Sequence, residues 1–411
     1  MSCGKGTRPG VEGQGEFAPT LRILVVSLAL AVAQAMPLAG QQGAVQENFP
    51  QLAQQAAEAQ RQGQGEQAIR LYLKALRIRP KWPDGWRNVG MLLADRKEYA
   101  RAEAAFRNLV DIEPKNADGW ALLGLVEYEQ GRYDDAFAHI QHGRALGMTN
   151  ADLYNVATFN AALIMIQKGE FEVAQELLVR VARSGVEDSD LTNAFGLAAL
   201  RIRSGLDKLE AQQKSLVARV GQIGYQATHS PVPETIAAYR KLLAEVPQAP
   251  GLHYAFGNFL INVAHYQEGI EELHKELELR PDDVMTLLQI AMTYLKINQP
   301  DRALPYAEKA LRLSPGFFAA HYALGWTLFK LGENERAIAE LEQVVQREPN
   351  SPQAHFALSQ AYLRAHRKAD ADRERGLFAK LKQRGLGLGA PPGGREYSGT
   401  PAENLPLRPE E

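Results

Sequence analysis

The chain has 411 residues, of which 45% are hydrophobic, and a formal net charge of −2. This is enough apolar material for a large buried core, and the near-neutral charge excludes the strongly basic surface that general nucleic-acid binding requires. The only cysteine is Cys3, so the rest of the sequence offers no disulfide, cysteine-based metal site or thiol nucleophile.

An apolar run at residues 23–32 follows Arg22 near the N-terminus. Its length is typical of a secretory signal, and the small residues Ala33 and Ala35 stand at cleavage spacing. We therefore expect residues 1–40 to be a signal peptide, residues 41–50 to be a linker, and the mature chain to be periplasmic or secreted. The long segment before the run carries acidic residues, which is atypical, so an uncleaved membrane anchor or no targeting role are the alternatives.

The following residues repeat with a period of 34. Trp86 and Trp120 are one period apart, as are Gly90 and Gly124, and we call the place of the two tryptophans the Trp position. The same step recurs in three sets of residues: Ala68, Ala102 and Ala136; Ala303, Ala337 and Ala371; Pro247, Pro281, Pro315 and Pro349. A period of this length is typical of stacked supersecondary units, none of which buries its apolar face alone.

Each unit has the pattern of two amphipathic helices. Trp86, Val89, Gly90 and Leu93 follow the i, i+3, i+4, i+7 spacing that places one apolar stripe on a helix. The small residue in this stripe lets a second helix approach closely, and Ala102 does the same from the other side. A proline then closes the unit, because it cannot continue a helix.

These residues together resemble the tetratricopeptide repeat, whose pattern is W-x2-L-G-x2-Y, then A-x3-F, then P. The resemblance covers roughly residues 50–383 and is strongest to the exported bacterial proteins of this family. It implies an all-α fold, a right-handed α-solenoid or superhelix of antiparallel helix pairs, with about nine full units and one half unit. It also implies that the first helix of each pair lines a concave wall.

The period lapses twice. Ala136 and Ala174 are 38 residues apart, so one unit has four extra residues, which we place in the turn at 147–153. Gly196 and Ile223 are 27 apart where 34 is expected, so we interpret the fifth unit as having lost most of its second helix.

These lapses predict two arms. The first arm is residues 51–203 with about four and a half repeats, and the second arm is residues 213–383 with about five. An irregular joint at 204–212 separates them, and a new helix is expected from about Leu206 or Ala211 to Gln226. Residues 384–411 are rich in Gly and Pro, and we expect them to be a disordered tail.

No constellation of residues in the sequence is typical of catalysis, so we expect no enzyme, no cofactor and no metal. His139 and His142 share a helix face, but no third ligand follows at metal spacing. His253, His321 and His355 occupy the Trp position of their units. There a ring fills the space between helices, and equivalent residues of neighbouring units lie about 10 Å apart, too far to share a metal.

The resemblance implies that the concave wall is lined by the residues two before and one, five, eight and nine after the Trp position. In the second arm these positions are unusually apolar and aromatic, with a basic rim. The candidate partner-binding residues are Tyr254, Asn258, Ile261 and Asn262; Met285, Leu288, Met292 and Lys296; Tyr322, Trp326, Phe329 and Lys330; Gln353, Phe356, Gln360 and Arg364.

Trp326 and Phe329 are the expected anchors, on the order of 2 kcal/mol each. We expect an apolar peptide segment to dock on them, with acidic flanks on the basic rim. The favoured function is a non-catalytic scaffold that binds a peptide or partner protein in its concave groove, in envelope assembly or a multiprotein complex. The alternative is a self-associating structural protein, a homo-oligomer whose groove holds another protomer. Neither nucleic acid nor a small-molecule substrate is expected.

Overall fold

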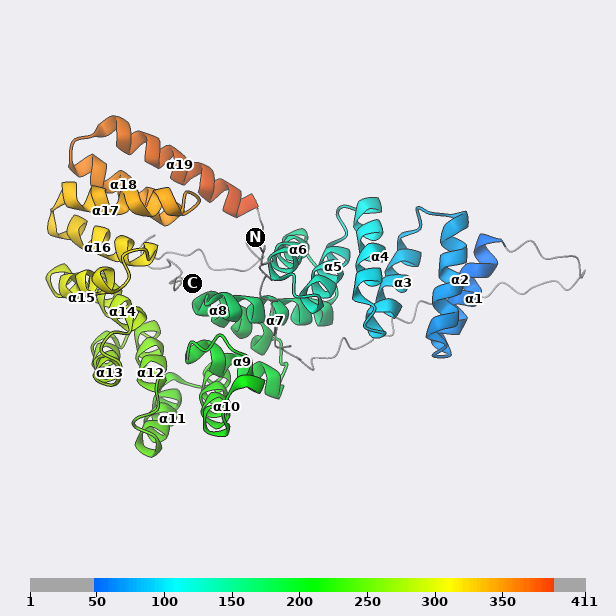
Figure 1. The fold of residues 1–411 in the computed structure, drawn as a ribbon, viewed down its shortest axis with the longest axis horizontal. Coiled ribbons are helices and arrows are strands. Elements are labelled where there is room, and N and C mark those ends of the chain that lie inside the picture. Colours follow the sequence, from blue (N-terminus) through cyan, green and yellow to red (C-terminus); the bar gives the residue numbers. More distant parts are fainter. Residues whose placement is uncertain (1–47, 388–411) are drawn as a thin grey trace, which may run out of the picture.

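The computed structural model describes residues 48–387, and this segment is a succession of α-helices with one short 3-10 helix and no strand (Figure 1). The expected fold is confirmed: the described part is an all-α, right-handed solenoid of antiparallel helix pairs. The predicted signal peptide, most of the linker, and the tail after residue 387 lie outside the described residues.

The helices span, in chain order, α1 Phe49–Arg61, α2 Gly65–Ile78, α3 Pro83–Asp95, α4 Tyr99–Ile112, α5 Ala117–Glu129, α6 Tyr133–Leu146, α7 Ala151–Lys168, α8 Phe171–Arg183, α9 Ser189–Ala199, η1 Leu206–Lys208, α10 Ala211–Gln226, α11 Val232–Glu245, α12 Leu252–Asn262, α13 Tyr266–Leu279, α14 Val284–Lys296, α15 Pro300–Leu313, α16 Phe318–Leu331, α17 Asn334–Arg347, α18 Pro352–Arg364 and α19 Lys368–Gly387. Two predicted boundaries move, because α1 begins inside the expected linker and α19 continues past residue 383.

The helices follow one another as hairpins along a curved path. In Figure 1, α1 to α10 form a row that crosses the view, and α11 to α19 continue as a second row that bends away from it. Successive first helices also touch: α12 packs on α14, α14 on α16, and α16 on α18. Stacking of this kind brings side chains that are one period apart onto the same wall.

Each first helix ends in the same backbone conformation. The residue eleven places after the Trp position has a positive φ in eight units, with values from 55° to 88°: Gly63, Lys97, Gly131, Gly169, Ala264, Asn298, Gly332 and His366. Glycine adopts this left-handed conformation without steric cost, whereas other residues are strained in it. The turn between the two helices of a pair is therefore a property of the repeat, and half of these units keep it without glycine.

Small residues let the two helices of a pair touch through their backbones, as predicted. A Cβ atom added at Gly124 of α5 would lie 2.8 Å from the carbonyl oxygen of Ala136 in α6. At Gly257 of α12 the nearest atom would be the carbonyl oxygen of Gly269 in α13, at 2.9 Å. Contacts this short leave no room for a side chain, so a larger residue would push the two helices apart.

The four extra residues of the fourth unit lie in a helix and not in the predicted turn. α7 has 18 residues, whereas α5 has 13. The connection from α6 to α7 is no longer than the one from α4 to α5. The predicted place, 147–153, overlaps the first turn of α7, but the extra residues there are helical, because a helix that gains about one turn keeps its apolar face in register.

The fifth unit has a second helix, contrary to our interpretation of the shortened period. α10 packs mainly on α9, and the two backbones are in direct contact. A Cβ atom at Gly196 would lie 2.0 Å from the Val217 carbonyl oxygen, and one at Gly221 would lie 1.9 Å from that of Thr192. By sequence phase α10 is the first helix of the next unit, yet it packs extensively on α9 and only slightly on α11.

Arg201 closes the turn at the end of α9 and links parts of the chain that are distant in sequence. It has a φ of 56°, so α9 stops about half a turn earlier than the other first helices. Its guanidinium Nη2 donates to Asp283 Oδ2 at 2.5 Å, and its Cζ lies 3.8 Å from the centre of the Tyr254 ring. The two side chains of this ion pair are only 8% and 13% exposed, which makes it a buried tie between α9, α12 and α14.

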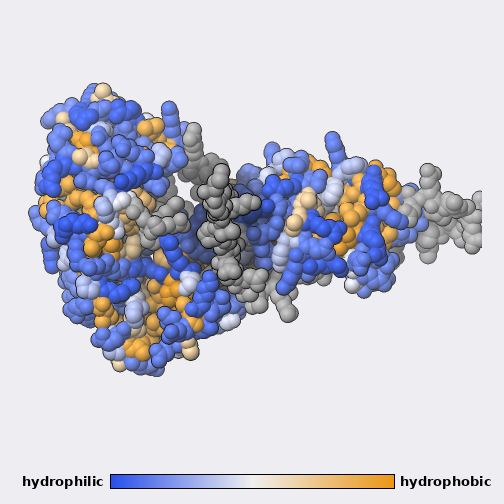
Figure 2. Space-filling view, viewed as in Figure 1, coloured by the Kyte–Doolittle hydropathy of each residue, from blue (hydrophilic) through white to orange (hydrophobic). Residues whose placement is uncertain are grey.

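Exposed large hydrophobic residues are scattered over the described part of the chain. The face in Figure 2 is mainly hydrophilic, with small separated hydrophobic areas. Large hydrophobic residues that are exposed come from elements far apart in the chain: Ile78, Leu146, Val232, Leu313, Leu363 and Leu377. Within residues 48–387, no helix is both long and apolar enough to span a bilayer.

Candidate partner-binding surface

The residues predicted to line the groove come from α12, α14, α16 and α18, the first helices of four successive pairs. Seven are buried: Tyr254, Ile261, Met285, Leu288, Tyr322, Trp326 and Phe329. Five are half-buried: Asn258, Met292, Gln353, Phe356 and Gln360. Four are exposed: Asn262, Lys296, Lys330 and Arg364. The accessible part of this wall is therefore its polar edge.

Trp326 and Phe329 belong to the core, and the expectation that they present open aromatic surface is wrong. They are 7% and 5% exposed, and their rings stack with centroids 4.9 Å apart. Arg364, from the next first helix, covers Phe329: its Cζ lies 4.0 Å from the ring centre, and its Nη1 donates to the Phe329 carbonyl oxygen at 2.8 Å. Lys330 Nζ lies 5.4 Å from the Trp326 ring centre. The cations lie against the rings that they were expected to flank.

The four exposed residues share one place in the repeat, nine residues after the Trp position. We call the three cations among them, Lys296, Lys330 and Arg364, the basic column; Asn262 precedes them at the same step. Each cation lies against an aromatic ring, since Lys296 Nζ is 5.5 Å from the centre of Tyr266. Such cation–π contacts restrict the long side chains, so their charges are presented in a row one repeat apart.

At the α12 end of this wall, Tyr254 is not available to a partner. Its ring lies under Arg201, burial raises its pKa, and its hydroxyl has no hydrogen-bond partner. Burial likewise raises the pKa of Tyr322. Next to them, Asn258 Oδ1 accepts a hydrogen bond from Gln289 Nε2 at 3.2 Å. These residues hold successive first helices together and do not face an open groove.

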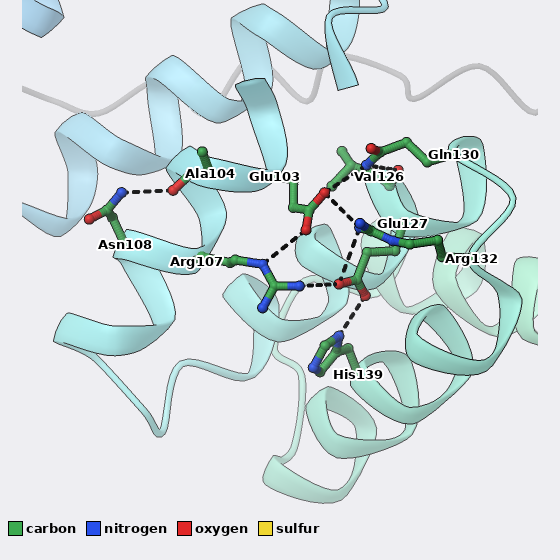
Figure 3. Close-up of polar contacts among 9 residues, drawn as sticks. All are labelled: Glu103, Ala104, Arg107, Asn108, Val126, Glu127, Gln130, Arg132 and His139. Atoms are coloured by element: carbon green, nitrogen blue, oxygen red, sulfur yellow. Dashed lines mark hydrogen bonds and ion pairs between the residues drawn. The ribbon is translucent and has the colours of Figure 1, made fainter. Parts of the chain in front are cut away.

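A buried ionic network between α4, α5 and α6 was not predicted (Figure 3). Glu127 is fully buried, and its carboxylate contacts Arg107 Nη2 at 3.1 Å, Arg132 Nη2 at 3.5 Å and His139 Nδ1 at 2.5 Å. Glu103 pairs with the same two arginines, at 2.9 Å and 2.6 Å. A charge buried this way requires several partners. Here Arg107 comes from the preceding unit, whereas Arg132 and His139 belong to the same unit as Glu127.

Electrostatics within this network favour the ionised carboxylate of Glu103. Burial acts to raise the pKa of Glu103, but hydrogen bonds from Arg132, Gln130 and Arg107 lower it below the ordinary value. A signal for the network was present in the sequence, because Glu127 stands at the stripe position that Leu93 and Leu328 hold in other units. An acid inside an apolar stripe predicts a buried partner of opposite charge.

The two histidines considered as metal ligands have other contacts. His139 binds Glu127, and its ring lies 5.2 Å from that of Trp120. The His142 ring meets the same tryptophan edge-on at 4.8 Å. Among the described residues, no group of three or more His, Cys, Asp or Glu side chains is placed to hold a metal ion.

Parts of the sequence match family models and a curated protein. Family models described as tetratricopeptide repeat match residues 53–117, 90–150 and 294–360. A curated protein of Arabidopsis thaliana, Protein CTR9 homolog, is 23% identical over 299 residues, which cover 60% of this chain and 27% of that protein. This chain thus spans little more than a quarter of the length of that relative.

Solved structures resemble parts of the chain. The crystal structure of MamA is 19% identical and covers 40% of this chain and 96% of its own, with a TM-score of 0.37. MamA from Desulfovibrio magneticus RS-1 is 24% identical and covers 37% and 86%, at 0.35. YrrB, described as a TPR protein with an unusual peptide-binding site, is 20% identical and covers 44% and 96%, at 0.35. With repeat models matching in both arms of a solenoid built on this period, the chain belongs to the tetratricopeptide repeat family.

Proposed function

We propose that this chain is a non-catalytic interaction scaffold that binds an acidic segment of a partner protein along the wall formed by α12, α14, α16 and α18. Its tetratricopeptide repeats support a protein-interaction scaffold. The acidic flanks expected from the sequence become the main binding element, because the aromatic rings expected to anchor an apolar segment are covered. Such a scaffold would act in envelope assembly or in another multiprotein complex.

The basic column is the observation that carries this proposal. Lys296, Lys330 and Arg364 are exposed at one repeat position, and none of the ion pairs found among the described residues neutralises them. An extended segment with carboxylates would meet a regular row of cations, and such complementarity favours both encounter and register. The half-buried Met292 and Phe356 lie on the same wall and offer apolar contact beside the charges.

In this proposal Trp326 and Phe329 act from beneath the surface. Their rings hold Lys330 and Arg364 in place, at 5.4 Å and 4.0 Å from the ring centres. A positioned cation loses less conformational freedom on binding than a free one, so removing the rings should weaken binding through the cations.

The test uses a fluorescent acidic peptide rich in Glu and Leu, and an uncharged Gln analogue, titrated against the full chain. Lys330→Gln/Arg364→Gln should weaken binding of the acidic peptide roughly tenfold, a loss of about 1.4 kcal/mol, and should lessen its salt dependence. The matched control is Lys241→Gln/Arg312→Gln, which removes two exposed charges from the second helices α11 and α15. An equal loss in both variants, or equal binding of the Gln analogue, would contradict the proposal.

Self-association is the competing outcome of the same experiment. Light scattering of the purified chain separates the two functions, because a groove occupied by a second copy gives a stable dimer. If Lys330→Gln/Arg364→Gln converts a dimer into a monomer while the acidic peptide does not bind, the wall is an interface between copies.

We also propose that the chain is exported through its N-terminal segment. The proposal is supported by the apolar run at residues 23–32 with small residues after it. Fractionation of the expressing cells and N-terminal sequencing test it together. A mature chain that still begins at Met1, or that stays in the cytoplasm, would refute cleavage or export respectively.

A further inference from the structure

Three histidines at the Trp position make the same contact with the second helix of their own pair. In each case the imidazole Nδ1 faces a glutamate oxygen nineteen residues further on: His253 and Glu272 at 2.6 Å, His321 and Glu340 at 2.6 Å, His355 and Glu374 at 2.7 Å. The three rings are 9%, 9% and 4% exposed, so water does not readily replace these partners.

The other ring nitrogen of each histidine contacts the unit before. His253, His321 and His355 direct Nε2 at the carbonyl oxygen of the proline six residues earlier, at 3.2, 2.9 and 2.9 Å. Trp86 and Trp120 make the equivalent bond, since each indole Nε1 donates to a proline carbonyl at 2.8 Å. These histidines therefore take the place of tryptophan, as the sequence predicted, and each adds a contact with a glutamate that Trp86 and Trp120 do not make.

Hydrogen-bond chemistry then sets the number of protons. A carbonyl oxygen only accepts, so Nε2 must carry a hydrogen. A carboxylate also only accepts, so Nδ1 must carry one too, and the ring is then an imidazolium. At the first of these sites burial acts to raise the pKa of Glu272, yet hydrogen bonds from His253 and Lys275 lower it below the ordinary value. The carboxylate is thus ionised, and the extra proton resides on the ring.

Few other charges surround these sites. At His253, the loop between α11 and α12 contributes the Pro247 carbonyl. Helix α13 contributes Glu272, Lys275 on the same carboxylate at 2.7 Å, and Glu276, which accepts from backbone amides at the start of α12. At His321 the only charged partner among the described residues is Glu340 of α17. At His355, α19 contributes Glu374 and Arg373, which are 3.1 Å apart.

We propose that each of these three imidazoles holds a second proton as part of the folded solenoid, so that the α11–α19 region loosens as pH rises through the range in which histidine titrates. The sign follows from the contacts. The folded state favours the protonated ring, so the stabilisation is present at lower pH and is lost as the proton leaves. Trp86 makes its proline bond without a titrating group and faces Ala105, so the α3–α4 pair lacks this contact.

The test compares thermal unfolding of the full chain between about pH 5.5 and 8.5. The key variant, His321→Trp/Glu340→Ala with His355→Trp/Glu374→Ala, copies the unit in which Trp86 faces Ala105. From pH 6 to 8.5 the wild-type midpoint should fall by about 5 °C more than that of the variant. The control His229→Gln, at an exposed histidine, should keep the wild-type fall. Equal pH dependence in all three proteins would overturn the proposal.

A measurement on the wild type alone decides the matter if the variant fails to fold. Nitrogen NMR of the imidazoles at about pH 7.5 distinguishes doubly protonated rings from either neutral tautomer. Three rings with both nitrogens protonated are expected, at His253, His321 and His355. Neutral rings at all three would refute the proposal, whether or not a partner binds the wall.

Discussion

Ala264→Gly should stabilise the chain, and Gly332→Ala should destabilise it, because both residues occupy the same turn position. Ala264 is exposed with a φ of 67°, and Gly332 has a φ of 88° with nothing within 4 Å of an added Cβ atom. Packing is therefore nearly constant in both exchanges. A left-handed conformation costs a non-glycine residue about 1–2 kcal/mol, and glycine in turn costs about 0.4–1 kcal/mol through the freedom of the unfolded chain. The difference predicts a change of about 0.5–1 kcal/mol in each direction.

Urea unfolding followed by circular dichroism gives the change in stability, provided that the slope with urea stays constant. Because repeat arrays can unfold in parts, hydrogen exchange at the His265 amide gives a local reading. This amide closes the turn by donating to the Leu260 carbonyl oxygen at 2.8 Å. Slower exchange is expected in Ala264→Gly. A lower midpoint and faster exchange in that variant would refute the argument from backbone strain.

Three further changes test the joint. Arg201→Met removes the more buried of the two arginines that pair with Asp283 and leaves Arg280 at 3.1 Å, so it should cost about 1.5–3 kcal/mol by urea unfolding. Adding Asp283→Asn should recover part of that loss, and a double variant no better than the single one would contradict the buried tie. Gly221→Ala should cost more than about 3 kcal/mol, because its Cβ would lie 1.9 Å from the Thr192 carbonyl oxygen, and a near-neutral result would mean that α9 and α10 are not in contact. Burial acts to raise the pKa of Asp283, but Arg201 and other hydrogen-bonding partners lower it below the ordinary value, so its stabilisation is present above about pH 4 and is lost as pH falls further. Asp283→Asn should therefore flatten the acid limb of a stability–pH curve.

The period predicted the parts of the fold that depend on one unit alone. Paired helices, their close approach at Gly124, and the ring that fills the Trp position all follow from the order of small and large residues within 34 places. The period gave a wrong prediction at α10, because the position of a helix within the repeat does not determine which neighbouring helix it packs against. The four extra residues between Ala136 and Ala174 were expected in a turn but are helical, because α7 could lengthen without losing its apolar face.

The wall of α12, α14, α16 and α18 shows where such prediction stops. Spacing correctly placed Trp326 and Phe329 on the helix face that the neighbouring first helices approach. How much of a ring stays open depends on the side chain that reaches over it, and Arg364 comes from 35 residues further along. The exposed cations were part of the predicted set. Only the burial of the aromatic residues, however, showed that these cations are the accessible part of the wall.

Because α10 packs on α9 although its sequence phase belongs to the next unit, the chain cannot be divided at the start of α10. A fragment that ends before Ala211 would lack α10, and the surface of α9 around Gly196 would be exposed to solvent. A fragment that begins at Ala211 would expose the side of α10 that packs on α9. Separate expression of the two halves should therefore give aggregation-prone, poorly soluble proteins. Dissection after Pro315, by contrast, keeps every hairpin complete and leaves the Arg201–Asp283 ion pair intact, although it separates α14 and α15 from α16.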